Sequence, residues 1–200
     1  MAAKITTKIH KEFRHNRLAL FDEMNVIATK KHVHKLYNSI YKTVKNEFLK
    51  VINQIYVEIY DEAVALGFDG DARDLDEAWL QEFFEEYNPV TKYVFNNEIE
   101  RKESRLFEAL ISNKLERLQS YKTAENLIAR QVKQYSIDLE DSIAMQVFRD
   151  TKVKKVMWVA EDDHKTCSVC NDLDGQIFDI KDAPQKQHLN CRCYLIPVKE

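Results

Sequence analysis

Apolar residues recur every three or four positions over much of the first 150 residues. This spacing places them on one face of a helix, which is stable when that face packs on another helix. The first long stripe predicts a helix ending near Leu66 and Gly67, and it consists of Val33, Leu36, Tyr37, Ile40, Val44, Phe48, Val51, Ile52, Ile55 and Ile59. A shorter amphipathic helix is expected before it, around Phe13 to Ala28.

An acidic helix is expected next, after the turn Gly67–Gly70. Asp74 or Asp76 can cap its first turn, and Asn88–Pro89 stops it after about Tyr87.

Two further stripes follow Pro89. The third helix is expected to begin at Thr91, with Val94, Phe95, Ile99, Leu106, Leu110, Ile111, Leu115 and Leu118 on its apolar face. Ser120 or Thr123 is expected to separate it from a fourth helix, whose stripe is Leu127, Ile128, Val132, Leu139, Ile143 and Val147. Each stripe needs a partner, so the pattern predicts a bundle of long helices.

Composition supports long helices, because the 200 residues include only three glycines and three prolines. Residues 1–66 and 90–174 contain neither. No run of about 18 apolar residues could span a membrane, and the first residues have no apolar core typical of a secretion signal. We therefore expect no membrane contact and a chain that stays in a reducing cytoplasm.

The pattern changes at Val153. Residues 153–159 have the β-branched and aromatic content of a short strand, and residues 161–200 hold all four cysteines and two of the prolines. A module of about forty residues needs a disulfide, a metal or a neighbouring domain to be stable. We expect a helical body over 1–122, a long helix over 123–152 that leads into the module, and the module itself over 153–200.

The cysteines have the spacing of a metal site. Cys167 and Cys170 form a Cys-x-x-Cys knuckle, and His188 lies three residues before Cys191, which is followed by Cys193. The knuckle and the pair formed by His188 and Cys191 can together supply four donors to a tetrahedral zinc ion. Four protein ligands leave no position for an activated water, so the spacing predicts a structural Zn²⁺, about one per chain. The predicted fold is mainly α, with a small C-terminal α+β module stabilised by zinc.

Five donors compete for four places. In an extended segment Cys191 and Cys193 would point to opposite sides, so one of them is expected to bind and the other to pack. Asp163, His164 and Asp174 lie near the knuckle in the sequence and are candidates for contacts to the ligands.

Other interpretations of the cysteines are weaker. A disulfide would leave the histidine unexplained. A thioredoxin-like pair lacks its strand-to-helix context, and His188 makes zinc simpler than an iron–sulfur cluster. Cys191 with His188 as its base has an unfavourable spacing for catalysis. His188-Leu-Asn190 is suggestive of a His-Asn-His nuclease, although the paired general-base histidine is missing.

Charge alternates along the chain. Residues 1–60 carry 11 basic and 5 acidic side chains, 61–100 carry 2 and 12, 101–160 carry 12 and 8, and 161–200 carry 5 and 8. The basic first segment could contact nucleic acid phosphates or an acidic protein surface. A solvated helix face is the simpler interpretation.

The module carries one longer motif, formed by Trp158, Asp163, Thr166, Cys167, Cys170, Leu173 and Gly175, followed by His188, Asn190, Cys191, Arg192 and Cys193. This motif resembles the minor head protein family of tailed bacteriophages, the phage Mu protein F-like family. The resemblance covers about residues 123–198. It departs from the family pattern before His188, where relatives often have proline, and at residues 146–151, which lack the usual Arg-Thr-Glu.

The resemblance implies a head morphogenesis protein that is not an enzyme. Its expected partners are the portal protein and the major capsid or scaffolding protein, with packaged DNA as a further candidate through the basic segments. The expected location is the virion, in the capsid interior or at the portal vertex, after synthesis in the bacterial host cytoplasm. Some relatives have Arg-x-x-His in place of Cys-x-x-Cys, which favours Cys170 over Cys167 as the indispensable ligand. The alternative function is a zinc-stabilised nucleic-acid-binding or nuclease module.

Overall fold

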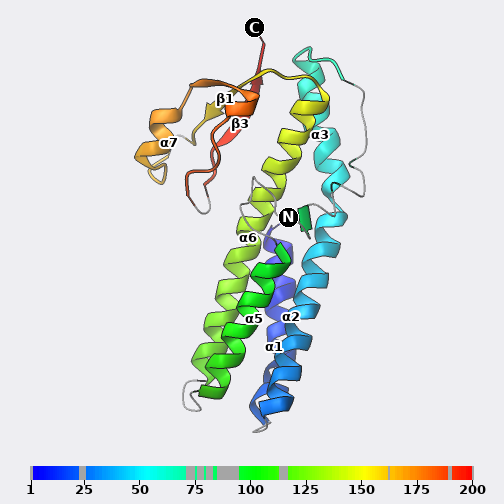
Figure 1. Cartoon of the computed structure of the whole chain (residues 1–200), viewed down its shortest axis with the longest axis vertical. Coiled ribbons are helices and arrows are strands. Elements are labelled where there is room, and N and C mark those ends of the chain that lie inside the picture. The colour runs from blue at the N-terminus through cyan, green and yellow to red at the C-terminus, as the bar shows by residue number, and fades with distance from the viewer. Residues whose placement is uncertain are drawn as a thin grey trace. The chain divides into compact units, whose positions relative to one another are not determined.

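The computed structural model describes residues 2–22, 26–70, 75, 79, 83–84, 95–112, 117–161, 163–188 and 191–199. Its long helices are α1 (Ala2–Asp22), α2 (Val26–Leu49), α3 (Ile52–Ala65), α5 (Phe95–Ser112) and α6 (Arg117–Asp150) (Figure 1). The C-terminal part adds a short helix, α7 (Ser168–Leu173), a 3₁₀ turn, η1 (Ile180–Asp182), and three short strands. The prediction of a mainly α protein with a small C-terminal α+β part is confirmed. None of the described helices contains an apolar stretch long enough to cross a membrane.

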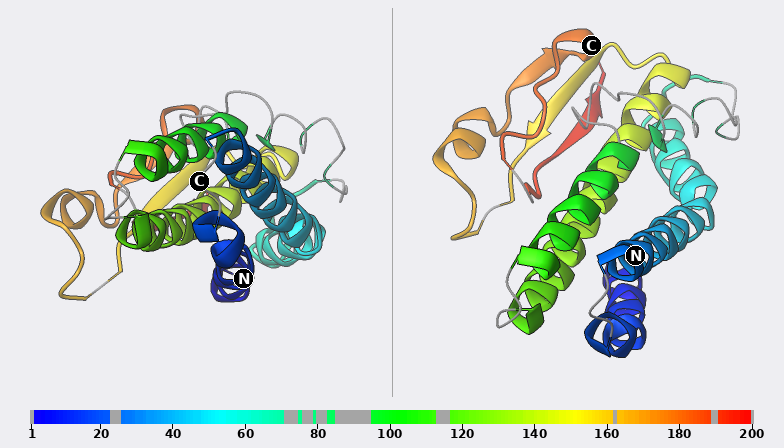
Figure 2. Two further views of the ribbon diagram at one scale, coloured as in Figure 1. Left: turned by 90° about the horizontal axis from the view of Figure 1, so that it is seen from below. Right: turned by 60° about the horizontal axis from the view of Figure 1, so that its bottom comes forward.

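The chain divides into two compact units. The first consists of Met1–Lys50 and Glu77–Ser136, and the second of Val51–Asp76 and Ile137–Glu200, so α6 contributes to both. In the first unit α1 packs on α2 and α2 packs on α5, and α5 lies beside the first part of α6 (Figures 1 and 2). The predicted stripes supply its core, which includes Val33, Leu36, Tyr37, Ile40, Val44, Phe48, Ile99, Leu106, Leu110, Ile128 and Val132.

Several predicted helix boundaries are wrong. The first stripe does not form one helix, because α2 ends at Leu49 and α3 begins at Ile52. Each of the two helices buries its own apolar face, so the periodicity continues through the break and does not reveal it. The first helix spans Ala2–Asp22 rather than beginning near Phe13, and it buries Ile5 and Ile9 as well.

The separation expected at Ser120 or Thr123 is also wrong, since both lie inside α6, which begins at Arg117. The expected acidic cap at Asp74 or Asp76 lies outside the described residues, as do the stop at Asn88–Pro89 and the start at Thr91.

The segment after α3 packs closely on the end of α6 within the second unit. Gly67 ends α3 with a φ of 83°, a backbone conformation that favours glycine. Gly70 approaches the backbone of α6: a Cβ added there would lie 2.5 Å from the carbonyl oxygen of Asp150. The hydroxyl of Tyr60 donates to the carbonyl of Gly70 (2.6 Å), and the hydroxyl of Tyr56 donates to the carboxylate of Asp150 (2.5 Å).

The three strands form one antiparallel sheet in the order β2-β1-β3. They are β1 (Lys155–Val159), β2 (Ile177–Asp179) and β3 (Tyr194–Val198). The strand predicted over 153–159 is therefore confirmed. Val156 pairs with Phe178 and Pro197, and Trp158 pairs with Leu195, so these side chains share one face of the sheet. Val156 and Trp158 are both buried on that face.

One carboxyl group of the second unit has a strongly raised pKa. Asp141 of α6 forms an ion pair with Lys186, whose Nζ lies 3.2 Å from Oδ1 of Asp141. Burial nevertheless raises the pKa of Asp141 from 3.8 to about 7, and the nearby Lys186 offsets only part of this effect.

We expect Gly70→Ala to destabilise the protein by about 1–3 kcal/mol, because its methyl group collides with backbone atoms that cannot rotate away. Urea unfolding measures the change. Replacement of the neighbouring exposed Asp69 by alanine is the control, with an expected effect within about 0.5 kcal/mol. Equal unfolding midpoints for Gly70→Ala and the wild type would show that the close approach is absent.

We expect Asp141→Asn to gain stability relative to the wild type as the pH rises. Because the pKa is raised, the folded state favours the neutral carboxyl over the carboxylate. This preference stabilises the wild type fully below about pH 4, and the stabilisation is lost as the pH rises through 7. The asparagine is neutral throughout, so the difference between the two proteins should grow by about 1–3 kcal/mol from pH 4 to pH 8. Urea unfolding at each pH tests this, with exposed Asp182→Asn as the matched control. A difference that does not change with pH would contradict the expectation.

Candidate metal centre

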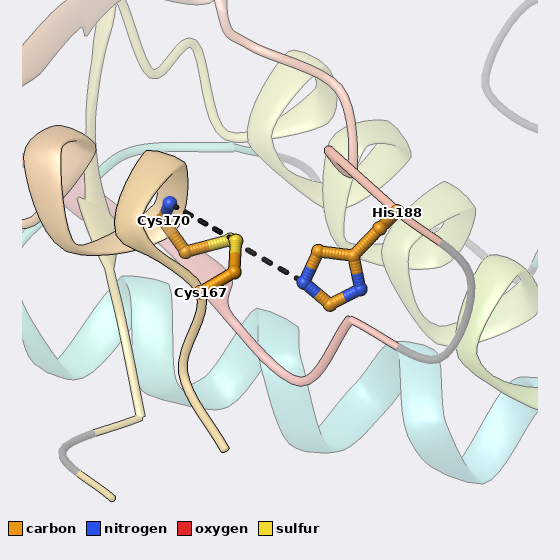
Figure 3. Close-up of side chains that lie close together, drawn as sticks. All are labelled: Cys167, Cys170 and His188. Atoms are coloured by element: carbon orange, nitrogen blue, oxygen red, sulfur yellow. Dashed lines mark hydrogen bonds between the residues drawn. The ribbon is translucent and has the colours of Figure 1, made fainter. Parts of the chain in front are cut away.

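The Cys-x-x-Cys knuckle lies at the start of α7. Cys167 is the N-cap residue of this helix, and its Sγ accepts a hydrogen bond from the backbone N–H of Cys170 at 3.4 Å. The carbonyl of Cys167 accepts from the backbone N–H of Asn171 (3.0 Å). This turn directs both sulfur atoms toward the same space, where the ring of His188 also lies (Figure 3).

The second pair of donors precedes β3. The backbone N–H of Cys191 donates to the carbonyl of His188 (3.2 Å), which holds the backbones of these two donors together. The sequence predicted that Cys191 and Cys193 would point to opposite sides, and this prediction is wrong. Their sulfur atoms and that of Cys170 all lie within 4.8 Å of one another. The expectation assumed an extended strand, whereas β3 begins only at Tyr194.

Cys170 is the donor at which the two pairs meet. Its Sγ lies 3.6 Å from Sγ of Cys191 and 3.7 Å from Nε2 of His188. It belongs to two groups of donor atoms, one with Cys167 and His188 and the other with Cys191 and Cys193. A tetrahedral zinc ion with Zn–S distances of about 2.3 Å keeps two sulfur atoms about 3.8 Å apart. The observed separations fit such an ion, and the cluster can hold a metal.

Three of the sulfur atoms are part of a core. Cys170, Cys191 and Cys193 are buried together with Trp158, and Phe178 packs against them. Cys167 is half-buried and His188 is exposed. The donors therefore run from the interior of the module to its surface, with the histidine on the solvent side.

The environment of the thiols differs between donors. Burial raises the pKa of Cys170 and of Cys191, because a thiolate is poorly solvated there. The N–H group of Cys170 lowers the pKa of Cys167 by stabilising its thiolate. A metal ion must displace protons from the buried thiols, so binding is expected to release protons and to favour neutral or alkaline pH.

The acidic residues predicted near the ligands have other partners. Asp163 accepts a hydrogen bond from Nη2 of Arg192 at 2.6 Å and another from the backbone N–H of Lys165 at 2.8 Å. These contacts, with Arg192 first, lower its pKa to about 2. Asp174 accepts from the backbone N–H of Ala160 (2.7 Å). His164 is exposed and belongs to neither group of donor atoms.

The sequence analysis assigned no role to two basic residues beside the donors. Arg192 lies between two candidate ligands and pairs with Asp163, while Lys186 donates to the carbonyl of Cys193 and pairs with Asp141. Their positions next to the donors were a signal that could have identified them, because side chains adjacent to ligands often hold those ligands in place.

Comparison with known families confirms the resemblance carried by the motif. The model of the family described as phage Mu protein F like protein matches residues 107–196, a range that contains all five candidate donors as well as Asp163 and Arg192. No curated protein and no solved structure matches the chain. Residues 107–196 therefore match the phage Mu protein F-like family, and this match supports a phage head-related protein.

Proposed function

We propose that this chain is a minor head protein, or head morphogenesis protein, of a tailed bacteriophage. In this role it is a structural and interaction protein associated with the portal and the capsid interior during head assembly and DNA packaging or ejection. The observation that supports the proposal is the family match, which coincides with the segment that carries the cysteine cluster. The portal protein is the proposed main partner, with the major capsid or scaffolding protein and packaged DNA as others.

The proposed cofactor is one structural Zn²⁺ ion. Cys170 is the best-supported ligand, because its Sγ lies 3.6 Å from Sγ of Cys191 and 3.7 Å from Nε2 of His188, and it belongs to both groups of donor atoms. In this proposal His188 and Cys191, the second pair at metal-ligand spacing, supply two further ligands. The fourth ligand is either Cys167, which groups with Cys170 and His188, or Cys193, which groups with Cys170 and Cys191. Zinc binding would supply folding free energy to this small sheet.

The chemistry of the donor set favours a structural role for the ion. Four protein donors complete a tetrahedron, so no position remains for a water molecule to be activated. Three of the sulfur atoms are buried in the same core as Trp158. In this proposal residues 153–200 act as a zinc-stabilised module, residues 123–152 lead into it, and residues 1–122 form the helical body.

Zinc content tests the ligand assignment. The wild type, purified under reducing conditions, is expected to contain about one zinc per chain, and Cys170→Ser is expected to lose the metal and to melt at lower temperature. Of Cys167→Ser and Cys193→Ser, one should lose zinc and the other should keep it, which makes the non-ligand variant the matched control. Elemental analysis and thermal unfolding are the measurements. A wild-type protein without metal, with stability unchanged by a chelator, would refute the site.

Co-assembly tests the role in the head. When the chain is expressed with the portal and major capsid proteins of the same phage, we expect it to sediment with the assembled heads, and the Cys170→Ser variant to do so less. Sedimentation followed by quantitative mass spectrometry measures both. Absence from the heads would contradict the proposal. Metal-dependent cleavage of duplex DNA, or DNA binding that weakens steeply with salt, would instead favour the nucleic-acid-binding or nuclease alternative.

A further inference from the structure

The two segments that carry the metal donors are joined by a charged contact. Nη2 of Arg192 lies 2.6 Å from Oδ1 of Asp163. Asp163 lies four residues before Cys167 in the first segment, and Arg192 stands between Cys191 and Cys193 in the second. The side chains are 30% and 42% exposed, so the contact lies at the surface of the module, directly beside the buried cysteines.

Asp163 is held in place by its own turn. Its Oδ1 also accepts from the backbone N–H of Lys165 (2.8 Å), and its carbonyl accepts from the backbone N–H of Thr166 (3.0 Å). The hydroxyl of Thr166 donates to the carbonyl of Glu161. An aspartate that bonds to the backbone two residues ahead fixes a tight turn. The carboxylate therefore has a defined position relative to Cys167, which follows the turn immediately.

The second segment is closed on itself by Lys186. Its Nζ donates to the carbonyl of Cys193, which ties the start of residues 186–193 to their end. The same Nζ pairs with Asp141 of α6 (3.2 Å). Lys186 and Cys193 are thus held together, and Arg192, the residue before Cys193, reaches the first segment.

We propose that Asp163 and Arg192 are a positioning pair that aligns the two donor-bearing segments for metal binding. The inference rests on the proposed metal site. Neither residue is proposed as a ligand, since the guanidinium offers no lone pair and Asp163 belongs to neither group of donor atoms. The pair acts by reducing the conformational freedom that the metal would otherwise have to remove when it brings Cys170 and Cys191 together.

A double-mutant cycle on the full-length protein tests the pair. The variants are Asp163→Asn, Arg192→Gln and the two combined, with Asp182→Asn as a control because Asp182 is an exposed carboxylate (68%) of the same module. Zinc affinity is measured by competition with a chromophoric chelator. The absorption bands of the cobalt-substituted protein report the geometry of the donors, which a residue important only for general stability would not alter.

Each single variant is expected to bind zinc about tenfold more weakly and to show altered cobalt bands, as is usual when a contact that orients a ligand is lost. The double variant should also lose about tenfold rather than about a hundredfold, because both substitutions remove the same interaction. The control should bind as the wild type does. If Asp163→Asn does not fold, Asp163→Glu takes its place in the cycle, with an expected loss of intermediate size.

Three results would overturn the inference. Single variants that bind zinc within about twofold of the wild type would show that the pair does not position the donors. Losses that multiply in the double variant would show that the two residues act separately. A wild-type protein that takes up no metal would overturn the metal site and the positioning pair together, whereas the first two results leave the metal site standing.

Discussion

The convergence of two chain segments on the sulfur of Cys170 is the constraint on which the C-terminal module depends. The knuckle at the start of α7 and the segment before β3 are separated by η1 and β2, yet both bring their donors to this atom. The surrounding core is small, since Trp158 shares it with Cys170, Cys191 and Cys193. Neutral thiols form only weak hydrogen bonds, so the proposed metal ion would supply cohesion that a sheet of this size lacks.

The helical part is stabilised by a different kind of interaction. Its stripes of apolar side chains interlock between helices, and aromatic residues add directed contacts, such as the edge-to-face pair of Phe13 and Tyr121. Tyr121 also donates a hydrogen bond to the carbonyl of Phe13 (2.5 Å). Helix α6 takes part in both compact units, contributing Ile128 and Val132 to the first and Asp141 to the second. The family match begins within α5 and includes all of α6, so the matched segment extends beyond the cysteine-bearing module.

The sequence predicted the existence of the helices better than their limits. Amphipathic periodicity is a property of each helix face, and it passes unchanged through the break at Lys50–Val51 because the helices on both sides have buried faces. The five candidate donors could be found from spacing alone, since a metal site requires closely spaced ligands. The orientation of Cys191 and Cys193 could not, because it depends on where β3 begins. The partners of Arg192 and Lys186 depend on contacts between distant parts of the chain, which periodicity does not encode.

The family assignment and the cysteine cluster support one account, in which a helical phage head protein carries a zinc-stabilised module. X-ray absorption at the zinc edge of the purified protein is the most direct test of that account. It predicts a shell of sulfur atoms at about 2.3 Å together with one nitrogen at about 2.0 Å, the pattern of three cysteines and a histidine around one ion. A shell of oxygen and nitrogen atoms without sulfur, or no zinc signal from protein kept reduced, would contradict it.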